Sequence, residues 1–390
     1  MVTDNLFQKA LPILKDLIRI NSVNPSLVPG GIGEKQIAQY LDELFLREGI
    51  QSEVQKVGKD RLNVVARVRG REGGPRILLN GHLDTVGVAG MKAPFEARED
   101  DGEIYGRGSQ DMKGGLAAAV AGLLAFSRNR PKFCGEVIFA AVADEEDRSI
   151  GTEHFLRNQP KDQPIDFCIV FEPTDLKVCT AHKGFAWLEV TVSGKAAHGS
   201  RPNEGIDAIR HMGRVLEQLE RLDKHLRSTP VHPLLGSGSL HASLIEGGRE
   251  WSSYPDRCVL KYERRTVPPE NEETVQKELD AILQKLAKAA TDFQAEGQLI
   301  CSRSPLQQDR KNPFAVQFHQ QAVNHFPKLT TWGTVSFWTD AALISEAGIP
   351  CVVFGPRGAG LHSLEECVVA SDVVACAELL HDFILALPGN

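Results

Sequence analysis

The chain has 390 residues, of which 42% are hydrophobic and 24% are charged, as in an ordinary folded protein. This length exceeds the size at which one hydrophobic core usually stops growing, so we expect two domains. A net charge of −7, no Lys/Arg-rich stripe and no apolar run near ~18 residues argue against nucleic acid and membrane partners.

The first 180 residues alternate helix-like and strand-like patterns. Apolar residues at helical spacing predict helices over 5–19, 34–48 and 113–128, the first of them capped at Thr3 or Asp4. Short continuous apolar runs predict strands at 63–70, 76–82, 136–144 and 166–172. Such runs, separated by helices, are typical of strands buried on both faces of an α/β sheet.

The pattern changes near Ala181. Strand-like stretches now alternate apolar and polar residues, as strands with one solvated face do, at 185–194, 239–248, 256–267 and 293–302. Two helices are predicted among them, over 204–227 and 272–290. The first character then returns, with helices at 313–325, 339–347 and 371–386 and a strand at 351–356. We therefore predict a two-part α/β catalytic domain, 1–180 and 303–390, with a mostly parallel central sheet. An α+β domain, 181–302, interrupts it.

Residues able to bind metal follow four of the predicted strands. They are His82 and Asp84, the adjacent Glu145 and Glu146, Glu172, and His362 at the end of a glycine-rich loop, with Asp111 in a further loop. Ligand sites of open α/β sheets form at the carboxyl ends of the strands, so these residues can converge.

The residue types suit two zinc ions, because zinc takes imidazole and carboxylate ligands in about fourfold coordination. Two histidines, two glutamates and a bridging aspartate give each ion one His, one Glu and a share of the Asp. Cobalt or manganese could occupy such sites as well. Asp84, two residues after His82, can reach the second ring nitrogen of that histidine. Glu145 and Glu146 point in opposite directions if extended, so one can bind metal while the other acts as a general base.

Each of these features has an ordinary alternative. A single His-x-Asp is a ligand pair in roughly one case in ten. The acidic pair fits a solvated loop or a helix cap, the glycine-rich loop a flexible turn, and His198 a surface position at a strand end. The joint occurrence of suitable residues after each strand favours the metal site.

The motifs together resemble the M20 zinc metallohydrolases over nearly the whole chain. These enzymes include acetylornithine deacetylase, succinyl-diaminopimelate desuccinylase, aminoacylase and glutamate carboxypeptidase-type enzymes. The similar segments occur in the order of the family: NGHLDTV, GRGSQDMKGG, ADEEDRSIGT, FEPT, AAHGSRP, ERRTVPPE and GLHSLEECV.

The resemblance implies a role for each candidate residue. His82, Asp111, Glu146, Glu172 and His362 would bind two zinc ions, with Asp111 bridging. Glu145 would be the general base and Asp84 would orient His82. The inserted domain would be a lid that carries a homodimer contact, and its His198 would stabilise the oxyanion in the neighbouring subunit's active site. Arg265 would bind the substrate carboxylate, and Ser252, Gly355 and Trp338 would also line the substrate site. Ser252 stands nearest to a position where many members have Asn, and Trp338 stands where glycine is frequent.

We therefore expect a metal-dependent hydrolase that cleaves the amide bond of an N-acyl amino acid or a similar small amide with a free carboxylate. A dipeptidase or carboxypeptidase of the same family is the alternative, and a non-catalytic metal- or ligand-binding relative is a further one. A cysteine hydrolase is not favoured, because none of the eight cysteines lies beside a suitable histidine in these motifs. Scattered cysteines, several of them in apolar runs, predict a cytoplasmic protein without disulfides.

Overall fold

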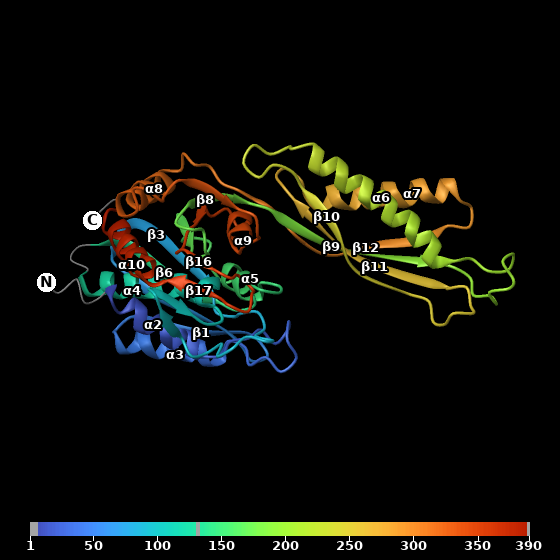
Figure 1. Ribbon diagram of the computed structural model, residues 1–390. Coiled ribbons are helices and arrows are strands. Elements are labelled where there is room, and N and C mark those ends of the chain that lie inside the picture. The colour runs from blue at the N-terminus through green and yellow to red at the C-terminus, as the bar shows by residue number, and fades with distance from the viewer. Residues whose placement is uncertain (1–6, 130–132, 388–390) are drawn as a thin grey trace. The chain divides into compact units, whose positions relative to one another are not determined.

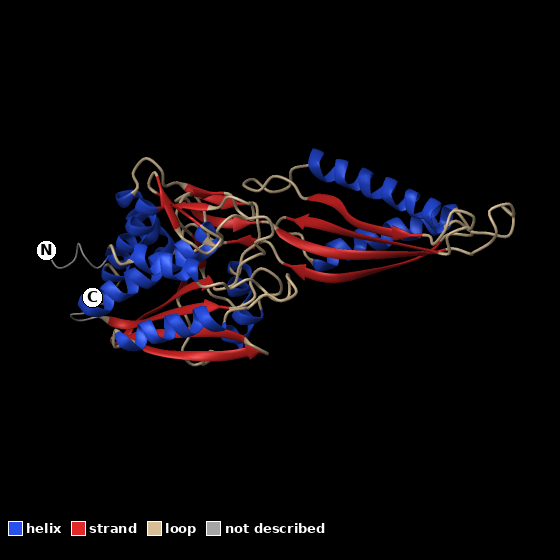
Figure 2. Cartoon of the chain, turned by 60° about the horizontal axis from the view of Figure 1, so that its bottom comes forward, coloured by secondary structure: helices blue, strands red, loops and turns tan. Residues whose placement is uncertain are grey.

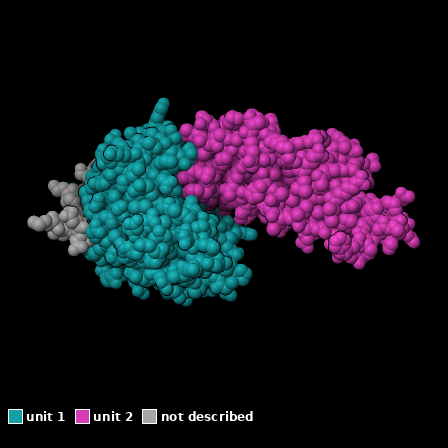
Figure 3. Space-filling model, in the orientation of Figure 1, with its two compact units in different colours: residues 1–180, 308–334, 339–390 teal, residues 181–307, 335–338 magenta. Residues whose placement is uncertain are grey.

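The chain forms two compact units (Figure 3). This computed structural model describes residues 7–129 and 133–387, so the predicted cap at Thr3 or Asp4 lies outside the described residues. Unit 1 comprises residues 1–180, 308–334 and 339–390, and unit 2 comprises 181–307 and 335–338. The insertion predicted from the sequence starts at the same residue as unit 2 and stops at 302 rather than 307.

Among the described residues, the larger sheet has nine strands. In spatial order they are β1 (Gln51–Gly58), β2 (Arg61–Arg69), β6 (Cys134–Val142), β3 (Arg71–His82), β7 (Phe167–Val170), β15 (Cys351–Val353), β8 (Val178–His182) and β13 (Leu306–Gln307), with β14 (Trp332–Val335) paired to β8. The central strands β6, β3, β7 and β15 are parallel, and antiparallel strands flank them. The predicted fold class, α/β with a parallel sheet centre, is confirmed.

Helices cover both faces of this sheet. On one face a single core cluster joins β3 residues Ile77 and Leu79 to the helices α2 (Ala10–Arg19), α3 (Lys35–Arg47), α4 (Gly114–Asn129), α8 (Pro313–His325) and α10 (Ala370–Leu385). Because side chains alternate along a strand, Leu78 points to the opposite face. There α5 (Ile150–Arg157) packs on β1, β2 and β6, and α9 (Ala341–Glu346) packs on α5 and β15 (Figure 1). Among the described residues, no helix combines the length and apolar character needed to cross a bilayer.

A small third sheet links two loops of unit 1 that are far apart in the sequence. Its order is β16 (Gly358–Ala359), β17 (Cys367–Val369), β5 (Glu103–Tyr105) and β4 (Arg98–Asp100). A kinked turn, η1 (Ser109–Lys113), follows β5 and leads into α4, and Asp111 and Met112 within it have non-helical backbone angles. Pairing of β5 with β17 therefore brings the segment of Asp111 beside the loop of His362.

Unit 2 is an antiparallel sheet with two helices and a core of its own. The strand order is β10 (Ser239–Gly247), β11 (Arg257–Thr266), β9 (Gly184–Ser193) and β12 (Gln294–Arg303). Figure 2 shows this sheet with helices beside it. The helices α6 (Ala208–Ser228) and α7 (Glu272–Ala289) pack on one face, as the alternating burial along β11 requires. The main segment of this unit, 181–307, begins and ends in paired strands, since Ala181 and His182 of β8 pair with Gln307 and Leu306 of β13.

The structure departs from the sequence prediction mainly at polar or very short strands. The strand β1 was not predicted, because most of its residues are at least partly exposed and show no clean alternation. The strand predicted over 136–144 ends at Val142, since Asp144 adopts a left-handed conformation with φ of 71°. Each predicted helix agrees with an observed one to within a few residues, but the helix α5 (Ile150–Arg157) was not predicted.

Candidate metal centre

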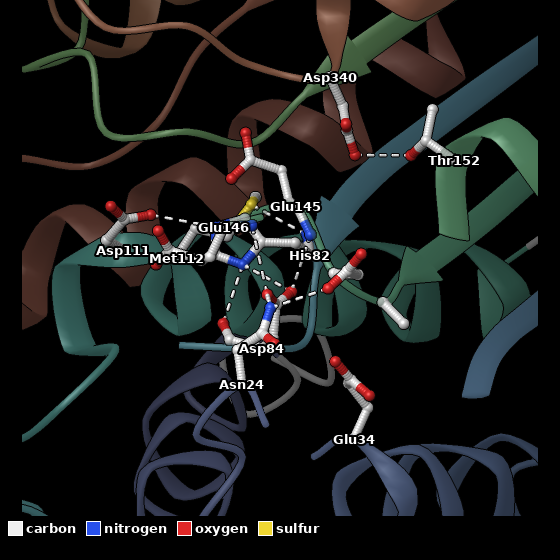
Figure 4. Close-up of polar contacts among 12 residues, drawn as sticks. Asn24, Glu34, His82, Asp84, Asp111, Met112, Glu145, Glu146, Thr152 and Asp340 are labelled. Atoms are coloured by element: carbon white, nitrogen blue, oxygen red, sulfur yellow. Dashed lines mark hydrogen bonds and ion pairs between the residues drawn. The ribbon is translucent and has the colours of Figure 1, made fainter. Parts of the chain in front are cut away.

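The predicted ligands gather at the carboxyl edge of the parallel strands. Figure 4 shows three of them, His82, Asp111 and Glu146. His82 is the last residue of β3, and Glu172 follows β7 by two residues. Glu145 and Glu146 lie in the turn after β6. Parallel pairing aligns these strand ends, with His82 opposite Val142 and Asn80 opposite Val170. Sequence-distant residues thus meet because their strands point the same way.

The five predicted ligands form two groups that share Asp111. The ligand atoms of His82, Asp111 and Glu172 lie within 4.8 Å of one another, and so do those of Asp111, Glu146 and His362. Asp111 Oδ1 lies 3.0 Å from His82 Nε2, and its Oδ2 lies 3.3 Å from His362 Nε2. Each oxygen of Asp111 therefore faces one group, as a bridging carboxylate does.

The loop that carries Asp111 is held by Glu366, which the sequence analysis did not single out. This buried carboxylate accepts the backbone N–H groups of Gly108, Gln110 and Asp111 at 2.9–3.0 Å. Arg107 Nη1 lies 2.7 Å from its Oε2. Glu366 follows His362 by four residues, so one short segment both supplies a candidate ligand and fixes the loop of another.

Asp84 holds the neighbouring turn in a similar way. Its Oδ1 accepts the N–H of Glu145 at 3.1 Å, and its Oδ2 accepts the N–H of Glu146 at 3.2 Å. His82 Nδ1 lies 2.9 Å from the Asp84 carbonyl oxygen and 3.6 Å from the carboxylate. The hydrogen bond that orients His82 thus goes to the backbone of Asp84, and the carboxylate instead orients the two glutamates.

The sequence interpretation took the backbone of Glu145 and Glu146 as extended. In the structure both residues lie in a turn that starts at Asp144. Burial raises the pKa of Glu145 well above its usual value, and the nearby Glu172, Asp340 and Glu146 raise it further, while His82 opposes this shift. A carboxylate with a raised pKa can both accept and return a proton near neutral pH. Glu145 is therefore suited to proton transfer.

The site contains more acid than its two histidines can neutralise. Burial is the largest influence on Asp111 and acts to raise its pKa, but hydrogen bonds with His362 and His82 lower it overall. Hydrogen bonds to Asp111 and Glu146 raise the pKa of His362 to about 10. Burial raises the pKa of Glu172 well above its usual value, and the neighbouring carboxylates contribute. Divalent cations would neutralise this excess.

The donor set fits such cations in a second respect. Among the described residues, Glu146 Oε1 is buried and has no hydrogen-bond partner. A buried carboxylate oxygen without a partner is costly unless a cation binds it. The two ligand groups that share Asp111 offer only imidazole nitrogens and carboxylate oxygens. These atoms match the ligand preferences of zinc, and of cobalt or manganese.

Comparison with known proteins agrees with this site. The model of peptidase family M20/M25/M40 matches residues 78–386. The chain belongs to this family. A probable succinyl-diaminopimelate desuccinylase of Staphylococcus epidermidis is 28% identical over 378 residues, covering 90% of each chain. The acetylornithine deacetylase of Myxococcus xanthus is 31% identical over 358 residues, covering 88% of this chain and 90% of that one.

The fold is shared with solved structures of the family. A dinuclear metal-binding M20 peptidase of Bacillus subtilis superposes with a TM-score of 0.75 at 17% identity, covering 99% of this chain and 100% of that one. The expected membership of the M20 family is confirmed, and with it the expectation of a hydrolase with a candidate dinuclear metal centre.

A further buried acid of this M20 chain, Asp340, was missed in the sequence. Thr152 Oγ1 donates to its Oδ2 at 2.6 Å (Figure 4). Its Oδ1 has no partner among the described residues. Burial raises the pKa of Asp340 to about 6, and the Thr152 hydrogen bond opposes this shift. The sequence analysis singled out Trp338, two residues earlier, but gave no role to Asp340.

Four predicted site residues belong to unit 2, which arranges them in two clusters. The segments of His198 and Ser252 run antiparallel, with His198 bridged to Ser253 and the Gly199 N–H donating to the Ser252 carbonyl at 2.7 Å. The exposed His198 ring uses Nδ1 toward Ser200 Oγ at 2.8 Å.

The second cluster contains Arg265 and Trp338. The Arg265 guanidinium lies 5.5 Å from the Phe185 ring centre, and the Phe185 and Trp338 rings are 6.0 Å apart. Arg265 Nε also donates to Glu263 Oε1 at 2.7 Å. Phe185 begins β9 and His198 follows its other end, so the two clusters lie at opposite ends of this sheet.

Gly355 has a packing role. A Cβ atom at this position would lie 2.3 Å from the Glu172 carbonyl oxygen. Its N–H donates to Thr174 Oγ1 at 3.1 Å, and its carbonyl accepts the N–H of Leu176 at 3.0 Å. Glycine at 355 therefore lets the end of β15 approach the segment that carries Glu172.

Proposed function

We propose that this M20 chain is a di-zinc deacylase. It hydrolyses the amide bond of an N-acyl amino acid, or of a similar small amide with a free carboxylate. The observation that carries the proposal is the pair of ligand groups sharing Asp111. The relatives named as a desuccinylase and a deacetylase support this reaction class over peptide hydrolysis.

His82, Glu172 and Asp111 would hold one ion, and His362, Glu146 and Asp111 the other. Bound ions of this kind polarise a scissile carbonyl and lower the pKa of a water molecule. Cobalt or manganese could substitute for zinc.

Within this site Glu145 accepts the proton of the attacking water and returns it to the leaving amine. Asp84 positions this step, because it holds the N–H groups of Glu145 and Glu146 and, through its carbonyl, the ring of His82. Arg265 binds the substrate carboxylate, and Ser252 and Trp338 shape the substrate site. His198 stabilises the oxyanion of the tetrahedral intermediate.

The spacing of Arg265 and His198 supports a homodimer formed through the inserted unit. From Phe185 to Ser193 the strand β9 spans about 25 Å at the usual rise per residue. An N-acyl amino acid is too small to contact Arg265 and His198 of one chain, so His198 would act in the partner's site. The edge strand β10, with Leu244 and Ile245 66% and 56% exposed, offers a surface for such a contact.

We place the enzyme in the cytoplasm, where thiols stay reduced. All eight cysteines lie in the described part of the chain, and none of them forms a disulfide there.

The test is release of primary amine from a panel of N-acetyl, N-succinyl and longer N-acyl amino acids beside dipeptides, with and without a chelator. Metal analysis of the same samples counts bound zinc. We expect release from one acyl class that the chelator abolishes and zinc restores. Turnover of dipeptides alone would replace the deacylase with a dipeptidase or carboxypeptidase. No turnover by a protein without bound metal would support a non-catalytic relative.

A further inference from the structure

Asn24 lies next to the turn that carries Glu145 and Glu146. Its single amide group bridges the carboxylates of Asp84 and Asp144. Its side chain is fully buried. The Nδ2 atom lies 2.7 Å from Asp84 Oδ2 and 3.0 Å from Asp144 Oδ1 (Figure 4). An amide nitrogen carries two hydrogens, one for each of these oxygens.

The surroundings of Asn24 fix the direction of this amide. Its Oδ1 accepts the N–H of Ser26 at 2.8 Å, so the nitrogen must point to the carboxylates. Its backbone N–H donates to the Thr85 carbonyl at 2.9 Å, and the Thr85 N–H donates to Ser22 at 3.1 Å. The loop of Asn24 is thereby tied to the segment that follows His82.

Asp84 acts on the turn with its carboxylate, and Asp144 acts on it with its backbone. Asp84 accepts the N–H groups of Glu145 and Glu146. Asp144 precedes Glu145, adopts a left-handed conformation, and accepts the N–H groups of Arg148 and Ser149 with its carbonyl. Fixing the side chains of Asp84 and Asp144 therefore fixes the backbone from which both glutamates project.

The charges of this cluster explain why a neutral donor stands at position 24. Arg61 binds Glu34 through two hydrogen bonds of 2.7 and 2.6 Å and reaches Asp144 at 2.8 Å. One guanidinium thus serves two buried carboxylates and makes no hydrogen bond to Asp84. Buried carboxylates need hydrogen-bond donors. Asn24 supplies a donor to each of Asp84 and Asp144 without adding another charge.

We infer that Asn24 is a positioning residue of the metal centre. It acts through Asp84 and Asp144 on the direction of the proton-transfer group Glu145 and of the ligand Glu146. The kinetic part of this inference rests on the proposed deacylase function, whereas the metal-binding part does not.

The experiment compares Asn24→Ala and Asn24→Asp with the wild-type enzyme. Asn24→Asp keeps the volume of the side chain but replaces the donor by a carboxylate that faces two others. Zinc affinity of the apoprotein is measured by competition with a chelator, and kcat and KM at saturating zinc. The control, Thr330→Val, removes another buried hydrogen bond of unit 1, the one to the Leu176 carbonyl at 3.0 Å.

We expect both Asn24 variants to lose zinc affinity and kcat by about 10- to 100-fold with KM within about twofold, as substitutions behind metal ligands do. Asn24→Asp should be at least as impaired as Asn24→Ala, and Thr330→Val should lose thermal stability alone. Wild-type zinc affinity in Asn24→Asp, or losses that only follow the fall in melting temperature, would overturn the inference. Asn24→Ser, small and still a donor, replaces any variant that does not fold, and should lose less than Asn24→Ala.

A wild-type enzyme that turns over nothing in the substrate panel would contradict the proposed function alone. The zinc affinities would then still decide the role of Asn24.

Discussion

At the scale of single residues, the candidate ligands differ in their access to solvent. The His82 side chain is 1% exposed, whereas that of His362 is 52% exposed. The group around His362 is therefore the side from which water, substrate or a chelator reaches the site. Glu145, half-buried beside these ligands and with a raised pKa, has the environment of a proton carrier rather than of a surface acid.

Replacing Glu145 with Gln should abolish nearly all turnover while both metal ions remain bound. The substitution removes the proton acceptor but keeps the shape of the side chain and the N–H group that Asp84 holds. Metal analysis and amine release on the same preparation check this expectation. Loss of zinc from Glu145→Gln would mean that Glu145 is a ligand and that Glu146 carries the proton.

At the scale of elements, the sequence pattern predicts the strands of the sheet but not the hydrogen bonds that hold the loops. The apolar strands β3, β6 and β7 were predictable because their burial leaves continuous apolar runs. The carboxyl ends of those strands gave the candidate ligands. The backbone hydrogen bonds of Asp84 and Glu366 were not predictable, because a carboxylate that accepts N–H groups looks the same in sequence as a solvated one. The turn at Asp144 was missed for a similar reason, since an aspartate with positive φ leaves no pattern.

Glu366→Gln should weaken the binding of both metal ions. A Gln amide keeps one acceptor oxygen, but its NH₂ group would meet the donors of Gly108 and Arg107. Because Asp111 belongs to both ligand groups, displacing its loop should lower zinc affinity about 10- to 100-fold at each site. Chelator competition measures the affinities. The control is Glu365→Gln, a substitution at the exposed neighbouring residue, and this variant should bind zinc as the wild type does.

At the opposite end of β6, Glu136 should make stability depend on acid pH. Burial acts to raise its pKa, but hydrogen bonds from Arg76 and Arg69 lower it overall. A carboxylate with a lowered folded-state pKa stabilises the fold above its unfolded pKa of about 4.3, and loses this contribution as pH falls through the folded value.

We therefore expect Glu136→Gln to cost about 1.5–3 kcal/mol at pH 7 and progressively less below about pH 4. Urea unfolding of wild type and variant from pH 7 to pH 3 gives the difference. Glu72→Gln, at an exposed position of β3, should show no such pH dependence. A difference between wild type and Glu136→Gln that is constant with pH would contradict the assignment.

At the scale of the whole molecule, the role proposed for His198 requires a second chain. The sequence predicted two domains from length and from the change in strand pattern, and the resemblance implied the dimer. The placing of His198 and Arg265 at opposite ends of one sheet could not be predicted, since it depends on the register of β9 with β11.

Mixing two inactive variants tests whether His198 acts across the dimer. His198→Ala alone should lower kcat by about 10²–10³ with metal content unchanged, as loss of one oxyanion donor does. Mixed with Glu145→Gln under conditions of subunit exchange, it should recover roughly a quarter of wild-type activity. Half of the dimers would be mixed, and each of these would have one complete site. No recovery, in samples that light scattering shows to be exchanging dimers, would mean that His198 serves its own chain.

The way the chain enters and leaves unit 2 has a consequence for how this protein can be engineered. Because Ala181 of β8 and Gln307 of β13 are paired neighbours, a tight turn in place of the intervening residues would close the polypeptide without stretching it. All five candidate ligands lie outside the excised segment. The residues on either side of the excised segment would thus form a smaller metalloprotein. Other substrate-recognition domains could be joined to it at the same point.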